Sequence, residues 1–511
     1  MPIRDIDRRR FLKLASAAGI ASTAGCIGGG GDGGGGNFAE AAAKLNLDQS
    51  WQQRRFERAR NDWPMEARKQ TPPRDAETWT NSQAFKSAVE NDVWKPPEGW
   101  QDTAAGDVDS IQIINHGAVN MTYDPATLAA HELFEEQTGI TVNPIEIGVS
   151  QANQREQQVL SSQKSSPHLM NVTGALLPSF IQQGWIEQTD ALYPEGVWEP
   201  YIPALQSLVR WSLGPGEGTH TYGSVNIAEG MVGHLRPDLM EEQGLDPARF
   251  QGEWSWDLLE EAMKAFEDTG TYAFAYYAGT ATYLSYSYRQ MLYQQGGRMV
   301  QEDGTVKVDT PESIRVVQKM KEWRDKGWVP GDVISYGEGD IVDLYLAGDL
   351  AYTHGFTDMV ARAVETYEPN TEYKPIVPPA ANAGGSSTQA TLIDPNSTSI
   401  NPYADEGHKL AAMLYGDLKL SYPTQWWELT YEGNLSYIDS VYDDAAQGGA
   451  LRWGDIFGTA VSNGVVELFP QMSSVFQRMS NPIQSAIQGE ITPADAMGQV
   501  QTYIDNNINT S

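Results

Sequence analysis

The chain has 511 residues, which at about 100–200 residues a domain predicts at least two hydrophobic cores. Its 67 Asp and Glu against 35 Lys and Arg give a formal net charge of -32, which disfavours nucleic acids and anionic membrane surfaces as partners. Because 40% of the residues are hydrophobic and 15 are Trp, the composition favours packed domains over disorder.

Residues 1–26 predict an exported lipoprotein. The run RRRFLK at 8–13 matches a twin-arginine export signal, and the apolar stretch at 14–24 is shorter than the ~20 residues that span a bilayer. The segment TAGC ends at Cys26, the one cysteine of the chain, and has the form of a lipobox, in which the Cys carries lipid. The alternative is an ordinary signal peptide with an incidental Cys. A single Cys leaves no internal disulfide.

Two segments separate this signal from the main body. Residues 27–37 are rich in Gly and predict a flexible linker, since no strand precedes them and no GK[ST] follows as in a phosphate loop. Residues 38–107 predict a helical extension, with helices near 39–47, 50–60 and 82–91 and five Trp. We interpret it as a collar anchored on the main body by its Trp side chains; the alternative is a docking arm for a membrane partner.

The main body opens with a βαβ pattern. A strand is expected at 111–114, followed by a turn at Asn115, His116 and Gly117. An amphipathic helix at 127–138 ends at Gly139, and the next strand begins at 140. This order predicts a parallel sheet.

Residues 231–266 predict a strand, a helix, a loop and a second helix. The apolar strand ends at Leu235, and Pro237 is a favourable first helical residue. Gly244 ends this helix, because Gly adopts positive φ at little cost. Ser255 is the N-cap of the second helix, whose apolar residues repeat at three- and four-residue spacing.

Several segments resemble family 1 extracellular solute-binding proteins of sugar ABC transporters, the maltose-binding-protein type. The segments that carry the resemblance are LRPDLMEEQGLDP with EWSWDLLEEA, FEEQTGITVNPIEI, LYLAGDLAYTHG and the closing PQMSSVFQRMSNPIQSAIQGEITPADAMGQVQTYID. The resemblance covers residues 111–508, with gaps near 198–215 and 439–464. An acidic, Lys-poor, Trp-rich composition with a lipobox further indicates a haloarchaeal-like lipoprotein from a high-salt environment.

The resemblance implies an α/β fold of two lobes, the type II-like fold of periplasmic binding proteins, with hinge crossings and an N-terminal helical extension. Lobe 1 is expected at 108–227 and 391–432, and lobe 2 at 228–390 and 433–511. The ligand is expected in the cleft between the lobes, which agrees with the general placement of ligands at strand ends and between domains, and with closure by hinge motion.

Sugars are bound by aromatic rings on their C–H faces and by polar groups on their hydroxyls. The resemblance places the following residues at ligand-binding positions: Asn115, His116, Asn171, Thr173, Glu229, Tyr283, Phe356, Thr357, Trp426 and Phe476. Trp427, beside Trp426, is a weaker candidate. Ala175 and Leu176 stand where the family's maltose binder has a charged pair, so the sequence does not support maltodextrin as the ligand.

The expected function is that of a lipid-anchored extracellular protein that captures a solute, a sugar, and delivers it to the permeases of an ABC importer. We expect a monomer on the outer face of the cell membrane with no nucleic-acid partner. No catalytic residue, cofactor or metal site is expected, because the sequence has no HExxH, CxxC, GxSxG or Walker motif. The alternatives are a secreted polysaccharide hydrolase with paired carboxylates, a ligand sensor for a signalling partner, and a ferric site at Tyr276 and Tyr277.

Overall fold

The computed structural model describes most of the chain after the predicted linker. The described residues are 43, 45, 49–69, 76–116, 125–190, 195–212, 218–252, 254–382 and 389–509. The predicted signal, lipobox and linker therefore lie outside the described residues, as does nearly all of the helix expected at 39–47.

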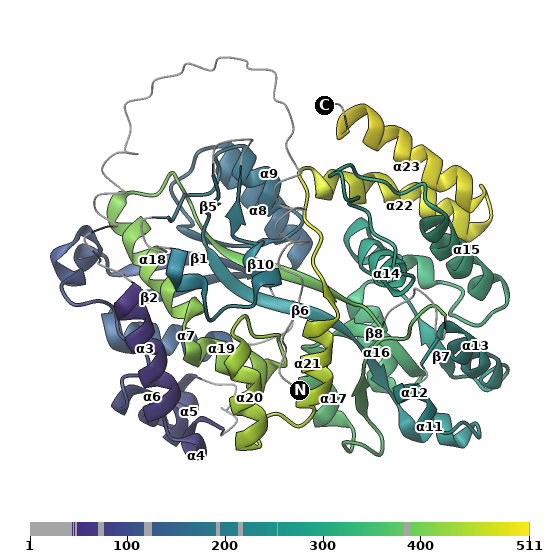
Figure 1. The fold of residues 1–511 in the computed structure, drawn as a ribbon, viewed down its shortest axis with the longest axis horizontal. Coiled ribbons are helices and arrows are strands. Elements are labelled where there is room, and N and C mark those ends of the chain that lie inside the picture. The colour runs from purple at the N-terminus through teal and green to yellow at the C-terminus, as the bar shows by residue number, and fades with distance from the viewer. Residues whose placement is uncertain are drawn as a thin grey trace. The chain divides into compact units, whose positions relative to one another are not determined.

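The described chain forms two compact units (Figure 1). Unit 1 comprises Glu229–Asp394 and the chain from Trp453 onward, and unit 2 comprises the described residues up to Ala228 together with Pro395–Arg452. The chain thus passes from one unit to the other three times. Two of these passages fall within strands, β6 (Ser224–Leu235) and β10 (Thr391–Ile400).

The sheet of unit 2 contains the predicted βαβ unit. β1 (Ser110–His116) pairs in parallel with both β2 (Thr141–Ile147) and β3 (Leu169–Thr173). The connecting helices are α7 (Pro125–Thr138) and α8 (Val149–Ser161), and Gly139 after α7 has a φ of +73°, as expected of a glycine that ends a helix. The last five residues of β10 run antiparallel to β3.

The N-terminal helices of unit 2 are held by aromatic side chains that pack edge to face. Trp63 packs edge-on against Trp427 at 5.8 Å between ring centroids, and Trp79 does so at 6.0 Å. The guanidinium of Arg68 lies 4.6 Å from the ring centroid of Trp426. The tryptophan side chains therefore anchor these helices within unit 2, as the collar interpretation expects. The helices are α3 (Gln49–Asp62), α4 (Met65–Arg68), α5 (Ala76–Asn81) and α6 (Gln83–Glu90), followed by the 3-10 turns η1 (Trp100–Asp102) and η2 (Ala104–Asp107).

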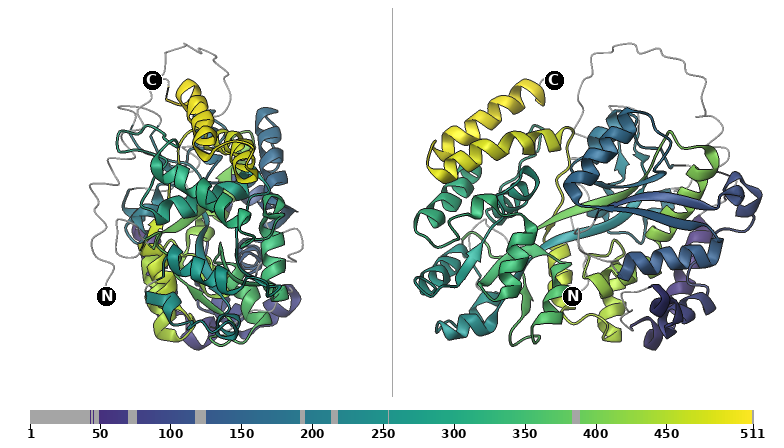
Figure 2. Two further views of the ribbon diagram at one scale, coloured as in Figure 1. Left: turned by 90° about the vertical axis from the view of Figure 1, so that its right-hand side faces the viewer. Right: turned by 180° about the vertical axis from the view of Figure 1, so that it is seen from behind.

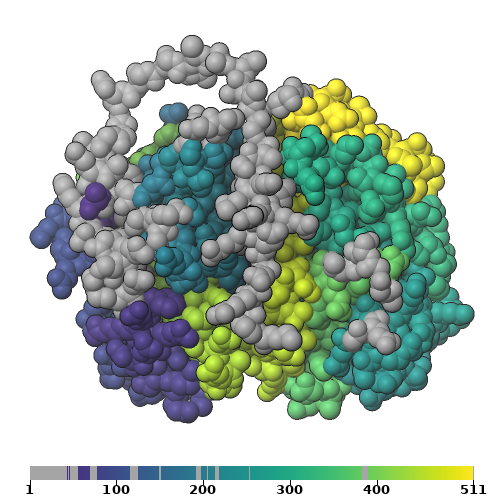
Figure 3. Space-filling model, viewed as in Figure 1, coloured from purple at the N-terminus to yellow at the C-terminus, as the bar shows by residue number. Residues whose placement is uncertain are grey.

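Residues 433–452 belong to unit 2, which corrects the lobe boundary expected at 432/433. Arg60 Nε donates to Asp444 Oδ2 at 2.7 Å, and the Tyr422 hydroxyl donates to the same oxygen at 2.7 Å. These bonds tie α20 (Asp439–Gly448) to α3 and to the buried α19 (Tyr422–Trp427); in Figure 3 the purple surface of the N-terminal helices adjoins a yellow-green surface. The sequence pattern does not reveal these contacts, because the two partners of Asp444 lie 384 and 22 residues away from it in the sequence.

The remaining elements of unit 2 are short or cover its sheet. They are α9 (Leu177–Gln182), η3 (Glu195–Trp198), α10 (Pro203–Gln206), β4 (Arg210–Trp211), β5 (His220–Thr221), α18 (Glu406–Leu420) and the π-helical η5 (Glu428–Glu432).

Unit 1 contains the strand–helix–loop–helix segment that the sequence predicts. β6 runs antiparallel to β8 (Leu350–Phe356) and β9 (Lys374–Ile376), and β7 (Tyr272–Ala275) runs parallel to β8. α11 (Pro237–Glu242) is followed by Gly244 at a φ of +74°, then by α12 (Arg249–Gly252). The Ser255 side chain accepts the Leu258 N–H and caps α13 (Trp256–Ala265), which confirms the predicted N-cap.

The other helices of unit 1 pack around this sheet and one another; α22 lies beside α23 and α15 in all views (Figure 2). They are α14 (Ala281–Gln294), α15 (Pro311–Asp325), η4 (Val333–Ser335), α16 (Glu338–Ala347), α17 (Met359–Thr366), α21 (Gly454–Ser462), α22 (Met472–Gln488) and α23 (Pro493–Asn507), with β11 (Gly464–Val465) parallel to the start of β10. None of the helices described here has both the length and the apolar character needed to cross a membrane.

Glu156 of α8 generates a stability prediction. Its side chain is fully buried, and neither carboxyl oxygen has a hydrogen-bond partner among the described residues. Burial raises the pKa of Glu156 well above its ordinary value, so the folded protein holds this proton to a higher pH than the unfolded chain does. The folded state therefore loses stability as pH rises from the ordinary Glu pKa toward the raised one, by about 1.4 kcal/mol per pH unit.

Glu156→Gln is expected to remove this loss, because an amide does not ionise. In denaturant melts between pH 4 and 8, the variant should match the parent at pH 4 and exceed its free energy of unfolding increasingly toward pH 8. Glu136→Gln, at an exposed position of α7, is the control. Parallel pH profiles for the Glu156 variant and the parent would contradict the prediction.

Candidate functional site

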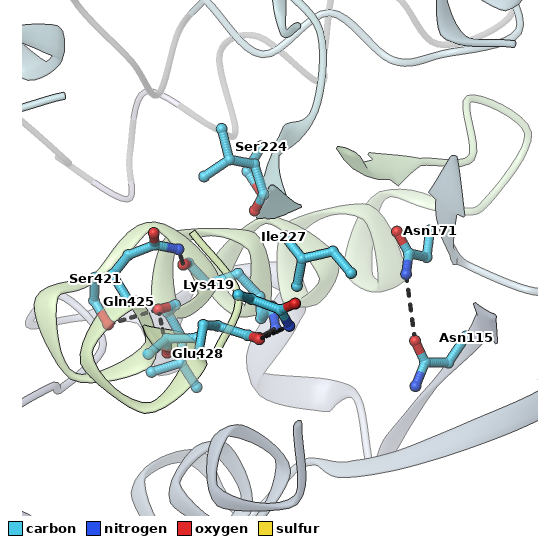
Figure 4. A network of polar contacts seen from close by, with 12 residues as sticks. Asn115, Asn171, Ser224, Ile227, Lys419, Ser421, Gln425 and Glu428 are labelled. Carbon is cyan, nitrogen blue, oxygen red and sulfur yellow. Dashed lines mark hydrogen bonds and ion pairs between the residues drawn. The ribbon is translucent and has the colours of Figure 1, made fainter. Parts of the chain in front are cut away.

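The predicted polar residues of unit 2 lie at the carboxyl ends of two neighbouring parallel strands. Asn115 and His116 are the last residues of β1, which corrects their expected placement in a turn, and Asn171 and Thr173 belong to β3. The strands are longer than predicted because Asn115 and His116 continue the pairing with β2. Asn171 Nδ2 donates to Asn115 Oδ1 at 3.4 Å (Figure 4), while the His116 side chain lies outside the described residues.

β10 adds two polar residues that sequence reasoning missed. Asn396 lies opposite Thr173, and Thr398 lies opposite Asn171, so all four side chains share one face of the sheet. All four are buried, and the part of the chain that the structure describes offers no partner to the Thr173 or Thr398 hydroxyl or to Asn171 Oδ1. The polar run NSTS inside a strand was the available signal, but only the register places it beside β3.

A buried ion pair lies elsewhere in the polar network drawn in Figure 4. Lys419 Nζ donates to Glu428 Oε1 at 2.7 Å, both side chains are 1% exposed, and Asn434 Nδ2 donates to Glu428 Oε2 at 2.9 Å. Burial, and then the charge of Lys419, lower the pKa of His131 to about 3, so this His is neutral. The pair holds the end of α18 to η5, and its charges are matched within the protein.

Trp426 and Trp427 lie in the core of unit 2. Both are fully buried, and the Trp426 indole N–H donates to the Arg68 carbonyl at 3.0 Å. Their rings contact the aromatic residues of the N-terminal helices, so the structure gives them an anchoring role in unit 2.

Three carboxyl groups from different elements of unit 1 lie near one another. Glu229 stands within β6, Glu338 begins α16, and Asp358 directly precedes α17, where it accepts a hydrogen bond from Arg362 at 2.9 Å. Burial raises the pKa of Glu229 well above its ordinary value, and the charges of Asp358, Glu338 and Asp394 raise it further. We refer to Glu229, Glu338 and Asp358 as the carboxyl cluster.

Glu338 is a member of this cluster that titrates near neutral pH. Burial is the main cause that raises its pKa to about 7, and the charge of Asp358 adds to it. Arg362 and a hydrogen bond with Tyr283 act in the opposite direction. Glu229, Glu338 and Tyr283 are each half-buried. The carboxyl groups can therefore accept hydrogen bonds from a polar molecule, and the Tyr283 ring can stack against it.

An aromatic wall, formed by Tyr277, Tyr283, Tyr286 and Phe356, adjoins the carboxyl cluster. The Phe356 and Tyr286 rings meet edge to face at 4.9 Å between centroids, and Tyr283 lies 6.1 Å from Tyr286 and 6.0 Å from Tyr277. The sequence-predicted residues Glu229, Tyr283 and Phe356 are thus brought together, while Glu338, Asp358, Arg362 and Tyr286 were missed. Thr357 is fully buried beside Phe356.

Phe476 does not belong to this wall. Its ring packs on Arg289, whose guanidinium lies 4.8 Å from the ring centroid. The two tyrosines considered for ferric ion do not form a site either, since the Tyr276 hydroxyl donates to the Met320 carbonyl at 2.8 Å while Tyr277 packs on Tyr283. Among the residues that the structure describes, no group of three or more His, Cys, Asp or Glu is arranged to hold a metal ion.

Solved structures of solute-binding proteins have the same fold as this chain. The maltose-bound MalE3 protein of T. maritima has a TM-score of 0.68 and 18% sequence identity, with 78% of this chain and 99% of that chain covered. An ABC transporter solute-binding protein of Thermotoga lettingae TMO with bound α-D-tagatose gives 0.68 and 19%, with 78% and 99% covered. One of Agrobacterium radiobacter K84 in complex with ribitol gives 0.66 and 14%, with 78% and 98% covered.

These likenesses confirm the predicted α/β fold of the two-lobe periplasmic binding proteins. A comparison with curated proteins found no match. The model of the family described as "Bacterial extracellular solute-binding protein" matches residues 120–417, which is more than half of the chain. The protein therefore belongs to the family of bacterial extracellular solute-binding proteins.

Proposed function

We propose that this protein captures an uncharged sugar or polyol outside the cell and delivers it unaltered to the permeases of an ABC importer. The observation that carries the proposal is the aromatic wall beside the carboxyl cluster in unit 1. Aromatic rings cover the C–H faces of a sugar, and carboxylates accept hydrogen bonds from its hydroxyls. Similar folds hold maltose, tagatose and ribitol, which supports a hydroxyl-rich ligand.

The negative charge of the carboxyl cluster favours a neutral ligand over an anionic one. Three carboxyl groups face Arg362 as their nearby cation, so an anionic sugar would add to a repulsion that already raises the pKa of Glu229. In unit 2, the candidate residues Asn115, Asn171 and Thr173 are uncharged amides and a hydroxyl. We propose that these residues, together with Glu229, Tyr283 and Phe356, contact the ligand.

Paired carboxyl groups also favour a second candidate function, glycoside hydrolysis. Glu338, with a pKa of about 7, would hold a proton as a general acid must, but burial raises the pKa of Glu229 as well, so Glu229 does not suit the ionised partner that this reaction needs. Membership of a family of binding proteins supports the receptor instead. Appearance of reducing ends during incubation with oligosaccharides distinguishes the two.

The attachment and environment of the receptor follow from the sequence. Export by the twin-arginine route and a lipid on Cys26 would hold the protein on the outer face of the membrane as a monomer beside its permeases. The net charge of -32 supports function at high salt, where dense counter-ions screen the repulsion among carboxylates.

Calorimetric titration with maltose, D-tagatose and ribitol tests the receptor, at low salt and at molar KCl. We expect binding without turnover, and greater stability in KCl.

Tyr283→Ala should weaken binding about tenfold, because stacking contributes on the order of 1 kcal/mol beyond buried area. Tyr503→Ala, a half-buried ring on α23, is the control and should leave affinity unchanged. Equal affinities for both variants would exclude Tyr283 as a contact, and equal stability at both salt concentrations would exclude the adaptation to salt.

The pKa of Glu338 predicts how affinity depends on pH. Above pH 7 the carboxylate is ionised and accepts stronger, charge-assisted hydrogen bonds from ligand hydroxyls. Affinity for the bound sugar should therefore rise between pH 6 and 8, and Glu338→Gln should abolish the rise. A variant at the exposed Glu302, Glu302→Gln, should keep it. A rise that persists in Glu338→Gln would show that another group titrates.

Cell fractionation tests the anchor. Cys26→Ser removes the thiol that a lipid would occupy, so the exported protein should move from the membrane fraction to the medium. Retention of the variant on the membrane, with export unchanged, would show that something other than Cys26 attaches it.

A further inference from the structure

We propose that Tyr286, the member of the aromatic wall on which Tyr283 and Phe356 pack, forms a positioning chain with Asp394, Arg289 and Phe476 that sets the Tyr283 and Phe356 rings without itself touching the ligand. The inference rests on the proposed function, because it assigns the wall to sugar binding. It also gives Phe476, which the sequence predicts as a ligand contact, a different role. Each link of the chain is a contact between buried side chains.

The first link is the hydroxyl of Tyr286. Its O–H donates to Asp394 Oδ2 at 2.9 Å, which holds the hydroxyl end of the ring in place. The same ring meets Phe356 at an interplanar angle of 89° and Tyr283 at 64°. Tyr286 is therefore the ring against which both proposed sugar-contacting aromatics pack, and a shift in the position of the Tyr286 ring would displace both.

The second link is the charge of Arg289. Its Nη2 lies 3.5 Å from Asp394 Oδ1, and its guanidinium lies 5.4 Å from the Tyr286 ring centroid and 4.8 Å from that of Phe476. Arg289 is 1% exposed and Asp394 2% exposed, so water does not compete for either. Cation–π contacts within 6 Å hold the guanidinium between the two rings.

Asp394 connects the positioning chain to a strand that passes from one unit to the other. Asp394 is the last residue of unit 1 on β10 before the chain enters unit 2. The same carboxylate is one of the charges that raise the pKa of Glu229, the first residue of unit 1 on β6. The aromatic wall is thus attached, through Asp394, to a strand along which the polypeptide passes from one unit to the other, and not to a surface loop.

Tyr288 provides a matched control on the same helix. It is fully buried, and its hydroxyl donates to Ser313 Oγ at 2.7 Å, on a side of α14 that does not contribute to the aromatic wall. Tyr286→Phe and Tyr288→Phe each delete one buried hydroxyl from α14, so their effects on stability should be similar. They differ in which neighbour loses its hydrogen bond.

The test measures sugar affinity and melting temperature together, with whichever of maltose, D-tagatose and ribitol binds the parent protein. Tyr286→Phe and Asp394→Ala should each weaken binding about tenfold, and the double variant should be no weaker than Asp394→Ala alone. Asp394→Asn retains an acceptor for the tyrosine hydroxyl but removes the charge that faces Arg289, so it should weaken binding less than Asp394→Ala does and more than Tyr288→Phe does. Tyr288→Phe should bind as the parent does.

Ring signals of ¹³C-labelled Phe, with Phe356 assigned through Phe356→Leu, supply a readout that needs no ligand. They should shift in Tyr286→Phe and stay unchanged in Tyr288→Phe. Equal affinities for these two variants, or unchanged Phe356 signals in Tyr286→Phe, would overturn the positioning chain. Failure of the parent to bind any sugar would instead overturn the proposed function, and the ring signals would then decide the positioning chain alone.

Discussion

The buried pair of Arg289 and Asp394 is the interaction on which the candidate site of unit 1 depends. Removing one member of such a pair leaves an uncompensated buried charge, which costs on the order of 3–5 kcal/mol. Here the pair also receives the Tyr286 hydroxyl and lies against Phe476. One interaction therefore both compensates a charge at the start of β10 and orients the rings that we assign to the ligand.

The two units offer a ligand different chemistry. Unit 1 presents carboxyl groups and tyrosine rings, while unit 2 presents amides and hydroxyls at the ends of β1 and β3, with Asn396 and Thr398 beside them. The buried charges of unit 2, Lys419 and Glu428, neutralise each other away from these residues. Each set by itself suits a neutral, hydroxyl-rich molecule, because hydroxyls can donate to carboxylates and exchange hydrogen bonds with amides.

The N-terminal helices illustrate how an added segment becomes part of a unit. Trp63 and Trp79 are fully buried against the rings of α19, and Arg60 reaches Asp444 of α20. Burial of several large aromatic side chains stabilises such a contact strongly, since each removes a large apolar area from water. Loss of these helices would expose Trp426 and Trp427, so they act as a structural layer of unit 2.

Much of this protein was determined by the sequence itself. Pro237, Gly244 and Ser255 mark helix ends through preferences that depend on neighbouring backbone groups, and several segments along the chain resemble the family. The sequence also predicted Glu229, Tyr283 and Phe356, which the fold brings to one place. These features are local, or recur in a fixed order along the chain.

Only the tertiary structure decided which side chains act together. Strand register placed Asn396 and Thr398 opposite Thr173 and Asn171, and long-range bonds to Asp444 moved residues 433–452 into unit 2. The carboxyl cluster draws on β6, α16 and α17, segments more than 100 residues apart at the extremes. Such convergence depends on the packing of distant segments, which no local pattern records.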